Sequence, residues 1–99
     1  MSIHQSTSLP ESPQVDSLVA LGQRIRATRR AQGLRIDDAA ALCGVAVDTL
    51  SRLENGHAGV STVRVMKVLD GLGLALFVVN KADAPAVLSL LPSLGARSA

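Results

Sequence analysis

Glycines divide the middle of this chain into short segments whose apolar residues recur at helical spacing. Glycine readily takes the left-handed backbone conformation with which many helices end, so each such position predicts a helix terminus. The predicted stops are Gly33, Gly44, Asn55-Gly56 and Gly73. They delimit helices from about residue 16 to the first stop, over residues 36–43, over residues 47–54, and from a capping Ser61 to the last stop. The pattern predicts an all-α bundle of four to five helices.

The hydrophobic period changes after Gly73, where the sequence predicts a strand. Residues 74–79 are apolar on both faces and β-branched at their end. A lone strand leaves its backbone N–H and C=O groups unpaired, and the simplest partner is the same segment of a second copy. We therefore predict a homodimer with one C-terminal β-strand pairing across it. The residues predicted in the paired strands are Leu74, Leu76, Phe77 and Val78.

The two ends of the chain differ in composition from its middle. Residues 1–15 are rich in serine, proline and glutamine, and we predict a disordered segment there. Residues 16–80 form the predicted domain with its dimerisation strand, and residues 81–99 a flexible apolar tail. The stretch Val87–Leu94 is unusually apolar for a free tail. Either it folds back on its own domain or dimer mate, or it docks on another partner.

Composition excludes several classes of protein. The 99 residues include one cysteine and two histidines, too few for a disulfide framework or a four-ligand zinc site, and we predict no metal or cofactor. The N-terminus has neither the basic start nor the apolar run of a signal peptide. The longest apolar stretch, residues 72–79, is far below the roughly 20 residues of a membrane helix. We expect a soluble, cytoplasmic protein with no membrane contact.

The sequence offers no set of side chains suited to catalysis. Asp37 and Asp38 are neighbours on a predicted helix, so their side chains diverge and cannot act as a carboxylate pair. Cys43 has no histidine near it in sequence and is expected in the core. His4 falls in the N-terminal segment, and the glycines at 71 and 73 precede a strand, where they form no phosphate loop. We predict that the protein is not an enzyme.

Positive charge gathers on the first predicted helix and the turn after it. The whole chain carries a formal charge of only +2, which is too little to indicate nucleic-acid binding by itself. Five arginines nevertheless precede the acidic residue Asp37 within one short stretch. They are Arg24, Arg26, Arg29, Arg30 and Arg35. This clustering predicts a local basic patch.

Two short helices joined by a glycine turn have the outline of a helix-turn-helix. The Gly44-Val45 turn and the run LSRLENG at residues 50–56 resemble the Cro/repressor (XRE) class of DNA-binding proteins. The continuation, VMKVL at 65–69 and LGL at 72–74, looks more narrowly like the HipB group of antitoxin repressors. The resemblance covers about residues 18–80. It implies a compact, lambda-repressor-like helix bundle.

The resemblance also implies roles for individual residues. Arg29 and Glu54 match a pair that in this class forms a largely buried ion pair between the first and third helices. The third helix would turn one face to DNA, and further residues would contact phosphates. The base-facing positions are Val47, Asp48, Ser51 and Arg52, and the phosphate candidates are Arg35, Thr49, Asn55, His57 and Arg64.

Each of these candidate contacts has a chemical basis. Arg52 suits a bidentate contact with guanine O6 and N7, and Val47 suits packing on a thymine methyl. Asp48 either accepts a hydrogen bond from cytosine or interacts with the dipole at the start of its helix. For each charged phosphate candidate, the alternative to a DNA contact is a surface charge that is simply solvated.

Several positions depart from the pattern of the class. Its second helix often begins Thr-Gln or Ser-Gln, where this chain has Arg35-Ile36, and Ala46 replaces the serine that commonly caps the third helix. His57 and Ser61 stand where HipB-like sequences often carry basic residues. With fewer phosphate contacts, DNA binding is expected to be salt-sensitive and to need both halves of a dimer.

The sequence therefore predicts a sequence-specific DNA-binding transcriptional regulator. By resemblance to HipB-like proteins, it would be an autoregulating antitoxin that binds a palindromic operator and a kinase-like, HipA-like toxin. The half-sites would lie about one helical turn, ~34 Å, apart. The alternative is a protein-interaction module that keeps the helix-turn-helix as a scaffold, with little specific DNA binding.

Overall fold

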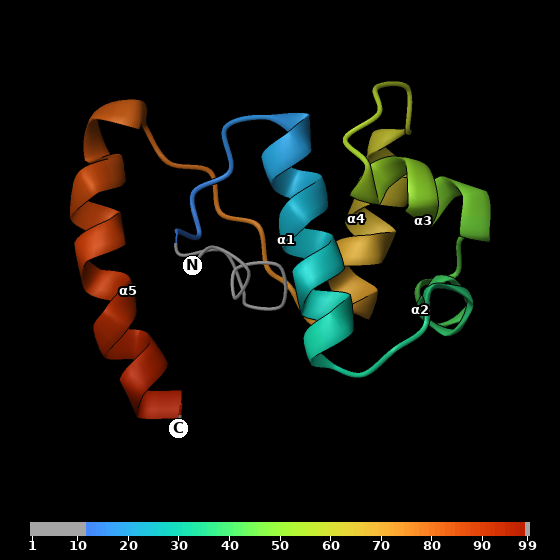
Figure 1. Cartoon of the computed structure of the whole chain (residues 1–99). Helices are drawn as coiled ribbons and strands as arrows, with labels where there is room; N and C mark the ends of the chain where they lie inside the picture. The colour runs from blue at the N-terminus through green and yellow to red at the C-terminus, as the bar shows by residue number, and fades with distance from the viewer. Residues whose placement is uncertain (1–11, 99) are drawn as a thin grey trace, which may run out of the picture.

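Four helices form a body around one core, and a fifth helix stands apart from it (Figure 1). The computed structural model describes residues 12–98, with side chains described through residue 91. The body consists of α1 (Leu18–Ala31), α2 (Ile36–Cys43), α3 (Val47–Glu54) and α4 (Thr62–Gly71). A 3-10 turn, η2 (Lys81–Asp83), then leads into α5 (Ala84–Ser98). The all-α prediction is confirmed, and the helices predicted over 36–43 and 47–54 have the predicted bounds.

Serine hydroxyls cap two of the helices. The Ser17 hydroxyl accepts a hydrogen bond from the Ala20 N–H at 3.0 Å, and the predicted cap Ser61 accepts one from the Arg64 N–H at 3.3 Å. Helices α2 and α3 begin without a side-chain cap. Each of these two helices instead carries aspartate in its first turn, where negative charge is favourable beside the helix dipole.

The core of the body is aliphatic. The largest fully buried side chains are Ile25, Leu50, Leu53 and Val68, one from α1, two from α3 and one from α4. Burying each such side chain contributes about 1.5–3 kcal/mol. Cys43 belongs to the same cluster, as predicted, and its thiol donates to the Val68 carbonyl at 3.6 Å.

Two glycines allow helices to approach closely. A Cβ on Gly22 of α1 would collide with the Leu53 carbonyl and lie 2.6 Å from the Glu54 carbonyl oxygen, both at the end of α3. A Cβ on Gly71 of α4 would lie 2.6 Å from the Cys43 sulfur of α2. Since backbone cannot retreat as a flexible side chain can, Gly22 fixes how closely α1 and α3 pack.

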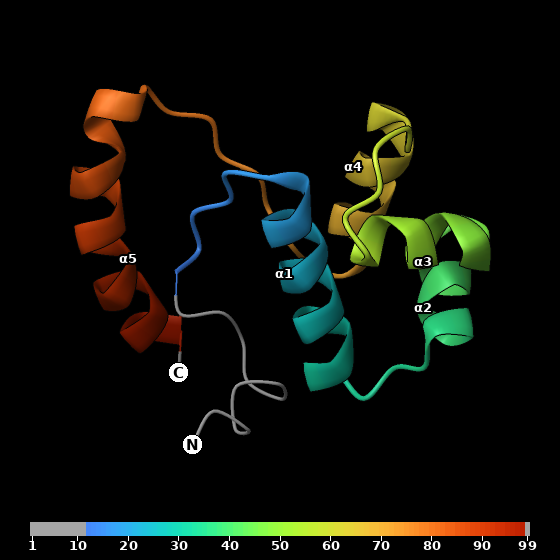
Figure 2. The same ribbon diagram turned by 45° about the horizontal axis from the view of Figure 1, so that its top comes forward.

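The strand predicted over residues 74–79 is not present in the described chain. These residues run as an extended connection between α4 and η2 (Figures 1 and 2). A strand needs the ladder hydrogen bonds of a neighbour, and the helical chain supplies no second strand. Leu74 packs partly against the core, whereas Leu76, Phe77 and Val78 are exposed. Pairing between two copies stays a prediction.

The flexible tail predicted over residues 81–99 corresponds to η2 and a helix in the structure. Pro85 occupies the first turn of α5, where its missing N–H has no helical partner to lose. Residues 1–11 of the predicted disordered segment, with His4, lie outside the described residues. Across residues 12–98, no helix combines the length and apolarity needed to cross a bilayer.

Gly22→Ala tests the close approach of α1 and α3. We expect it to destabilise the fold by about 1–3 kcal/mol, because the added methyl meets backbone carbonyls. Thermal unfolding followed by circular dichroism measures the change. The control is Gln23→Ala at the neighbouring exposed position, expected to stay within about 0.5 kcal/mol. Equal melting temperatures for the two variants would contradict this packing.

Candidate nucleic-acid interface

A tight turn at Gly44 joins α2 to α3. Gly44 has φ 74° and ψ 33°, the left-handed conformation that glycine adopts without strain. The next N–H, of Val45, donates to the Ala40 carbonyl at 3.0 Å. The turn places α3 against α2, and α1 also packs on α3. These two short helices with their glycine turn form a helix-turn-helix unit.

Helix α3 has one buried and one open face. Leu50, Leu53 and Glu54 are buried on one side. The predicted base-facing residues lie on the other, at positions i, i+1, i+4 and i+5 of the helix. Val47, Asp48 and Arg52 are exposed, and Ser51 and Thr49 are half-buried. The face that remains open therefore carries a cation, an anion and a β-branched apolar side chain.

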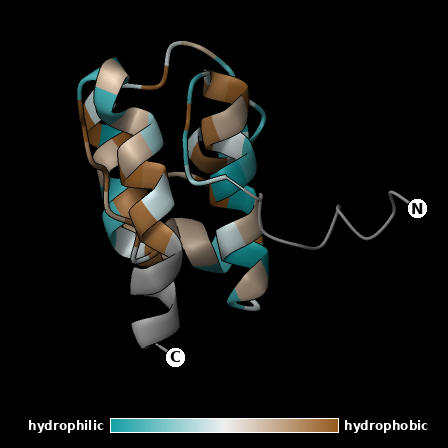
Figure 3. Cartoon of the chain, turned by 90° about the vertical axis from the view of Figure 1, so that its left-hand side faces the viewer, coloured by the Kyte–Doolittle hydropathy of each residue, from teal (hydrophilic) through white to brown (hydrophobic). Residues whose placement is uncertain are grey.

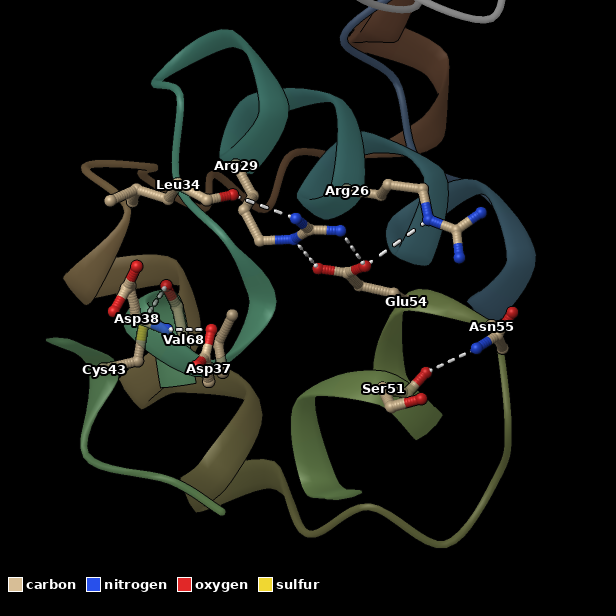
Figure 4. Close-up of polar contacts among 10 residues, drawn as sticks. All are labelled: Arg26, Arg29, Leu34, Asp37, Asp38, Cys43, Ser51, Glu54, Asn55 and Val68. Carbon is tan, nitrogen blue, oxygen red and sulfur yellow. Dashed lines mark hydrogen bonds and ion pairs between the residues drawn. The ribbon is translucent and has the colours of Figure 1, made fainter. Parts of the chain in front are cut away.

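An ion pair between Arg29 and Glu54 connects α1 to α3 (Figure 4). The Arg29 Nε donates to Glu54 Oε2 at 2.6 Å and its Nη2 to Oε1 at 2.9 Å, so the contact is bidentate. The remaining donor, Nη1, reaches the Leu34 carbonyl at 3.0 Å. The Glu54 side chain is 1% exposed and that of Arg29 11%. This is the pair that the family resemblance implied.

Arg26 is a second partner of Glu54 that the sequence analysis did not single out. Its Nε lies 3.4 Å from Glu54 Oε1, and its side chain is 42% exposed (Figure 4). Arg26 lies three residues before Arg29 on α1, and this spacing on one helix face was the available signal. Hydrogen bonding to Glu54 raises the pKa of Arg29, against the lowering effect of burial. The buried carboxylate is thus matched by a permanent cation.

Arg52 lies beside the loop between α3 and α4. A Cβ on Gly59 would be 3.6 Å from its Nη2, and the loop is tied to α3 where the His57 N–H donates to the Arg52 carbonyl at 3.0 Å. His57 itself is exposed. The structure therefore brings Arg52 and the predicted phosphate candidate His57 together at the C-terminal end of α3.

Three other candidates are exposed but already make local contacts. The Asn55 side-chain amide donates to the Ser51 carbonyl at 2.7 Å and so caps its own helix (Figure 4). Arg35 Nη2 lies 3.1 Å from Asp37 Oδ2 in an exposed ion pair. Arg64 Nη1 donates weakly to the Ser61 hydroxyl at 3.5 Å. A phosphate group would compete with each of these contacts.

The chemistry of the described side chains outside this surface is limited. No three metal-ligating side chains cluster within residues 12–91. Burial, with a further contribution from the negative charge of Asp70, raises the pKa of the Cys43 thiol. The thiol is therefore kept protonated in the core, where its contact is the Val68 carbonyl.

The glycine turn, the open face of α3 and the buried pair behind it define a helix-turn-helix protein. The chain belongs to the helix-turn-helix domain family, whose sequence profile matches residues 20–76. Its fold is that of a transcriptional regulator and agrees with the predicted resemblance to the Cro/repressor (XRE) class. No curated protein matches the chain.

Solved structures with the same fold include HipB and a controller protein. A chain of a HipA-HipB-O2-O3 complex is 20% identical, with a TM-score of 0.63, and the match covers 69% of this chain and 96% of that one. A HipB-O4 20mer complex gives the same values. The restriction-modification controller protein C.AhdI from Aeromonas hydrophila is 34% identical, with a TM-score of 0.53, covering 59% of this chain and 84% of that one. At 20% identity, the HipB likeness is one of fold.

Glu54→Gln tests whether the buried pair stabilises the fold. We expect a loss of about 3–5 kcal/mol in unfolding free energy, because the Arg29 cation is left buried without its carboxylate. Urea unfolding measures the loss. The control is Arg26→Ala, which removes the exposed partner of the same carboxylate and should change stability by less than about 1 kcal/mol. A Glu54→Gln protein as stable as the Arg26→Ala control would refute this role.

Proposed function

We propose that this protein is a sequence-specific DNA-binding transcriptional regulator that acts as a homodimer. The observation that carries the proposal is the division of α3 into two faces. Its buried face is held to α1 by the Arg29–Glu54 pair, and its open face presents Arg52, Asp48 and Val47 in a helix-turn-helix frame. A helix presented in this way fits the major groove of B-DNA.

The open face of α3 supplies the proposed base contacts. Arg52 donates to guanine O6 and N7, and Val47 packs on a thymine methyl. Ser51 lies on the same face, and Asp48 there either accepts from cytosine or serves the helix dipole. The proposed phosphate contacts come from the surrounding turns and helix starts, at Arg35, Thr49, Asn55, His57 and Arg64.

The ion pair between Arg35 and Asp37 affects how the proposed phosphate contact forms. Arg35 exchanges an exposed carboxylate for a phosphate, so the net gain from this residue is small. An exposed pair of this kind contributes about 0–1 kcal/mol and weakens with salt. The proposed complex therefore depends on both subunits and is salt-sensitive.

The extended segment after α4 supports the proposed homodimer. Phe77 and Val78 are 82% and 89% exposed in the single chain, although both are large apolar residues. Antiparallel pairing of residues 74–79 between two copies would satisfy the backbone groups of this segment and cover these side chains. A two-fold dimer would place its two α3 helices on a palindromic operator, with half-sites ~34 Å apart.

A finer assignment is an autoregulating HipB-like antitoxin that also binds a HipA-like toxin. The support is the fold shared with HipB, which has been solved in a complex with HipA and with O2 and O3. The antitoxin role predicts that the chain co-purifies with the product of a neighbouring gene. Loss of that interaction would leave the DNA-binding proposal intact.

The alternative is a protein-interaction module that uses the helix-turn-helix as a scaffold. The observation that favours it is the apolar exposure beyond the body, at Leu76, Phe77, Val78 and Leu90. Specific DNA binding separates the two proposals, because an interaction module needs none.

Arg52→Ala tests the proposed base contact. The probe is the duplex directly upstream of the protein's own gene, compared by fluorescence anisotropy with a shuffled duplex between about 50 and 200 mM salt. We expect the native protein to prefer its own duplex by about a thousandfold or more. Arg52→Ala should lose about 1–3 kcal/mol for each half-site on the own duplex and far less on the shuffled one.

Two control variants make the result specific. Arg64→Ala removes a proposed phosphate contact from each subunit, so it should weaken binding to both duplexes alike and lower the salt slope of the dimer by about 2. Lys81→Ala removes an exposed charge from η2 and should change neither affinity. Equal, weak binding of the native protein to both duplexes would reject the DNA-binding proposal in favour of the interaction module.

A further inference from the structure

Helix α5 lies outside both the family match and the core. The matched segment ends at residue 76, eight residues before α5 begins. The core cluster and the partly buried residues packed on it include no side chain of α5. Among the described elements, α5 packs closely on the η2 turn that precedes it. In Figures 1 and 2, α1 lies between α5 and α4 of the same chain.

The composition of α5 is unlike that of a helix exposed to water. From Ala84 to Ala96 it contains no charged residue, and Figure 3 shows brown, apolar turns along its described part. Leu90 is 63% exposed. Ala84, Val87, Leu88 and Leu91, at helical spacing, form a half-buried stripe. An isolated helix of this length is marginal in water, so an uncharged one needs a surface to pack on.

The four-helix body offers an apolar surface that its own chain leaves open. A shallow hollow of about 430 Å³ lies along α4, lined by Thr62, Val63, Met66, Lys67 and Asp70. Val63 is 67% exposed and Met66 45%. The hollow extends over about 12 Å of helix, and the α5 stripe over about 10 Å. Its two charged residues, Lys67 and Asp70, are both exposed and opposite in sign, so the hollow carries no net charge beneath an uncharged helix.

The order of elements along the chain indicates which copy of α5 reaches this hollow. Residues 74–80 begin at the C-terminal end of α4 and end at η2 and α5. In an antiparallel pair, the end of one strand lies beside the start of the other. Pairing these segments between two copies therefore brings the start of one copy's α5 to the C-terminal end of the other copy's α4.

We propose that α5 is an exchanged arm, which packs its Ala84–Leu91 stripe into the α4 hollow of a second copy of this chain. The inference rests on the homodimer of the proposed function and adds a second contact to it. Each copy gives one α5 and receives one, so the contact is repeated by the two-fold axis. The exchange covers the open α4 hollow and completes the burial of the α5 stripe.

Disulfide trapping between two different variants tests the exchange. In a Cys43→Ala background, a tagged Met66→Cys chain is mixed with an untagged Leu88→Cys chain and oxidised. We expect a covalent tagged–untagged heterodimer as the main product. Its yield should be about tenfold higher than the heterodimer yield from a tagged Leu42→Cys chain mixed with the same Leu88→Cys chain. Leu42 is an exposed control on α2 that does not line the hollow.

Other trapping results overturn the proposal. Leu88→Cys homodimers without heterodimers would mean that the α5 helices pair with each other. A third chain carries both Met66→Cys and Leu88→Cys. A disulfide within this chain, and none between chains, would mean that α5 folds onto its own α4. Two further measurements, Phe77→Cys self-crosslinking and DNA binding, distinguish a wrong placement of α5 from a failure of the proposed function. If both persist while the heterodimer is missing, the arm placement is wrong and the proposed function stands.

A charge in the hollow gives an independent measurement. Val63→Glu changes an exposed residue, so its circular dichroism should match that of the native protein. We expect it to raise the dimer dissociation constant in sedimentation about tenfold or more, because the charge would be buried under α5. Leu42→Glu, at a similarly exposed residue, should leave the constant unchanged. Equal constants for the two variants would overturn the proposal.

Discussion

The bidentate contact between Arg29 and Glu54 determines how α3 is held. Glu54 is the last residue of α3, and its carboxylate is buried against α1. That geometry requires α1 and α3 to approach closely, and Gly22 permits it because any side chain there would meet the end of α3. The same arginine also hydrogen-bonds the Leu34 carbonyl, two residues before α2 begins, so one guanidinium contacts the end of α3 and the turn into α2.

The surface of α3 and its neighbouring turns that faces away from the Arg29–Glu54 pair is mixed in charge. Arg52 is exposed near the loop at Gly59, Asp48 lies in the first turn of the same helix, and Arg35 pairs with Asp37. A surface of this kind attracts phosphates only weakly, so the proposed DNA complex relies on base contacts and on two copies acting together. The exposed apolar segment after α4 offers a means of bringing two copies together.

Local signals in the sequence predicted much of the body. Glycine stops and apolar spacing gave α2 and α3 with the bounds the structure has, and the family motif gave the Arg29–Glu54 pair. The three-residue spacing of Arg26 and Arg29 places both on one face of α1, but only the packing of α1 on α3 brings Arg26 to Glu54. Helix α5 stands where a flexible tail was predicted, since Pro85 falls in its first turn and interrupts no helical hydrogen bond there. The predicted strand depends on a second molecule, which one chain cannot supply.

We propose that the open face of α3 contacts the bases of DNA. A titration of isotope-labelled protein with the duplex upstream of its own gene, followed by NMR, tests this most directly. We expect the largest amide shift changes from Val47 to His57, with much smaller changes when the duplex is shuffled. Changes confined to residues 74–98, or the same changes with both duplexes, would contradict it.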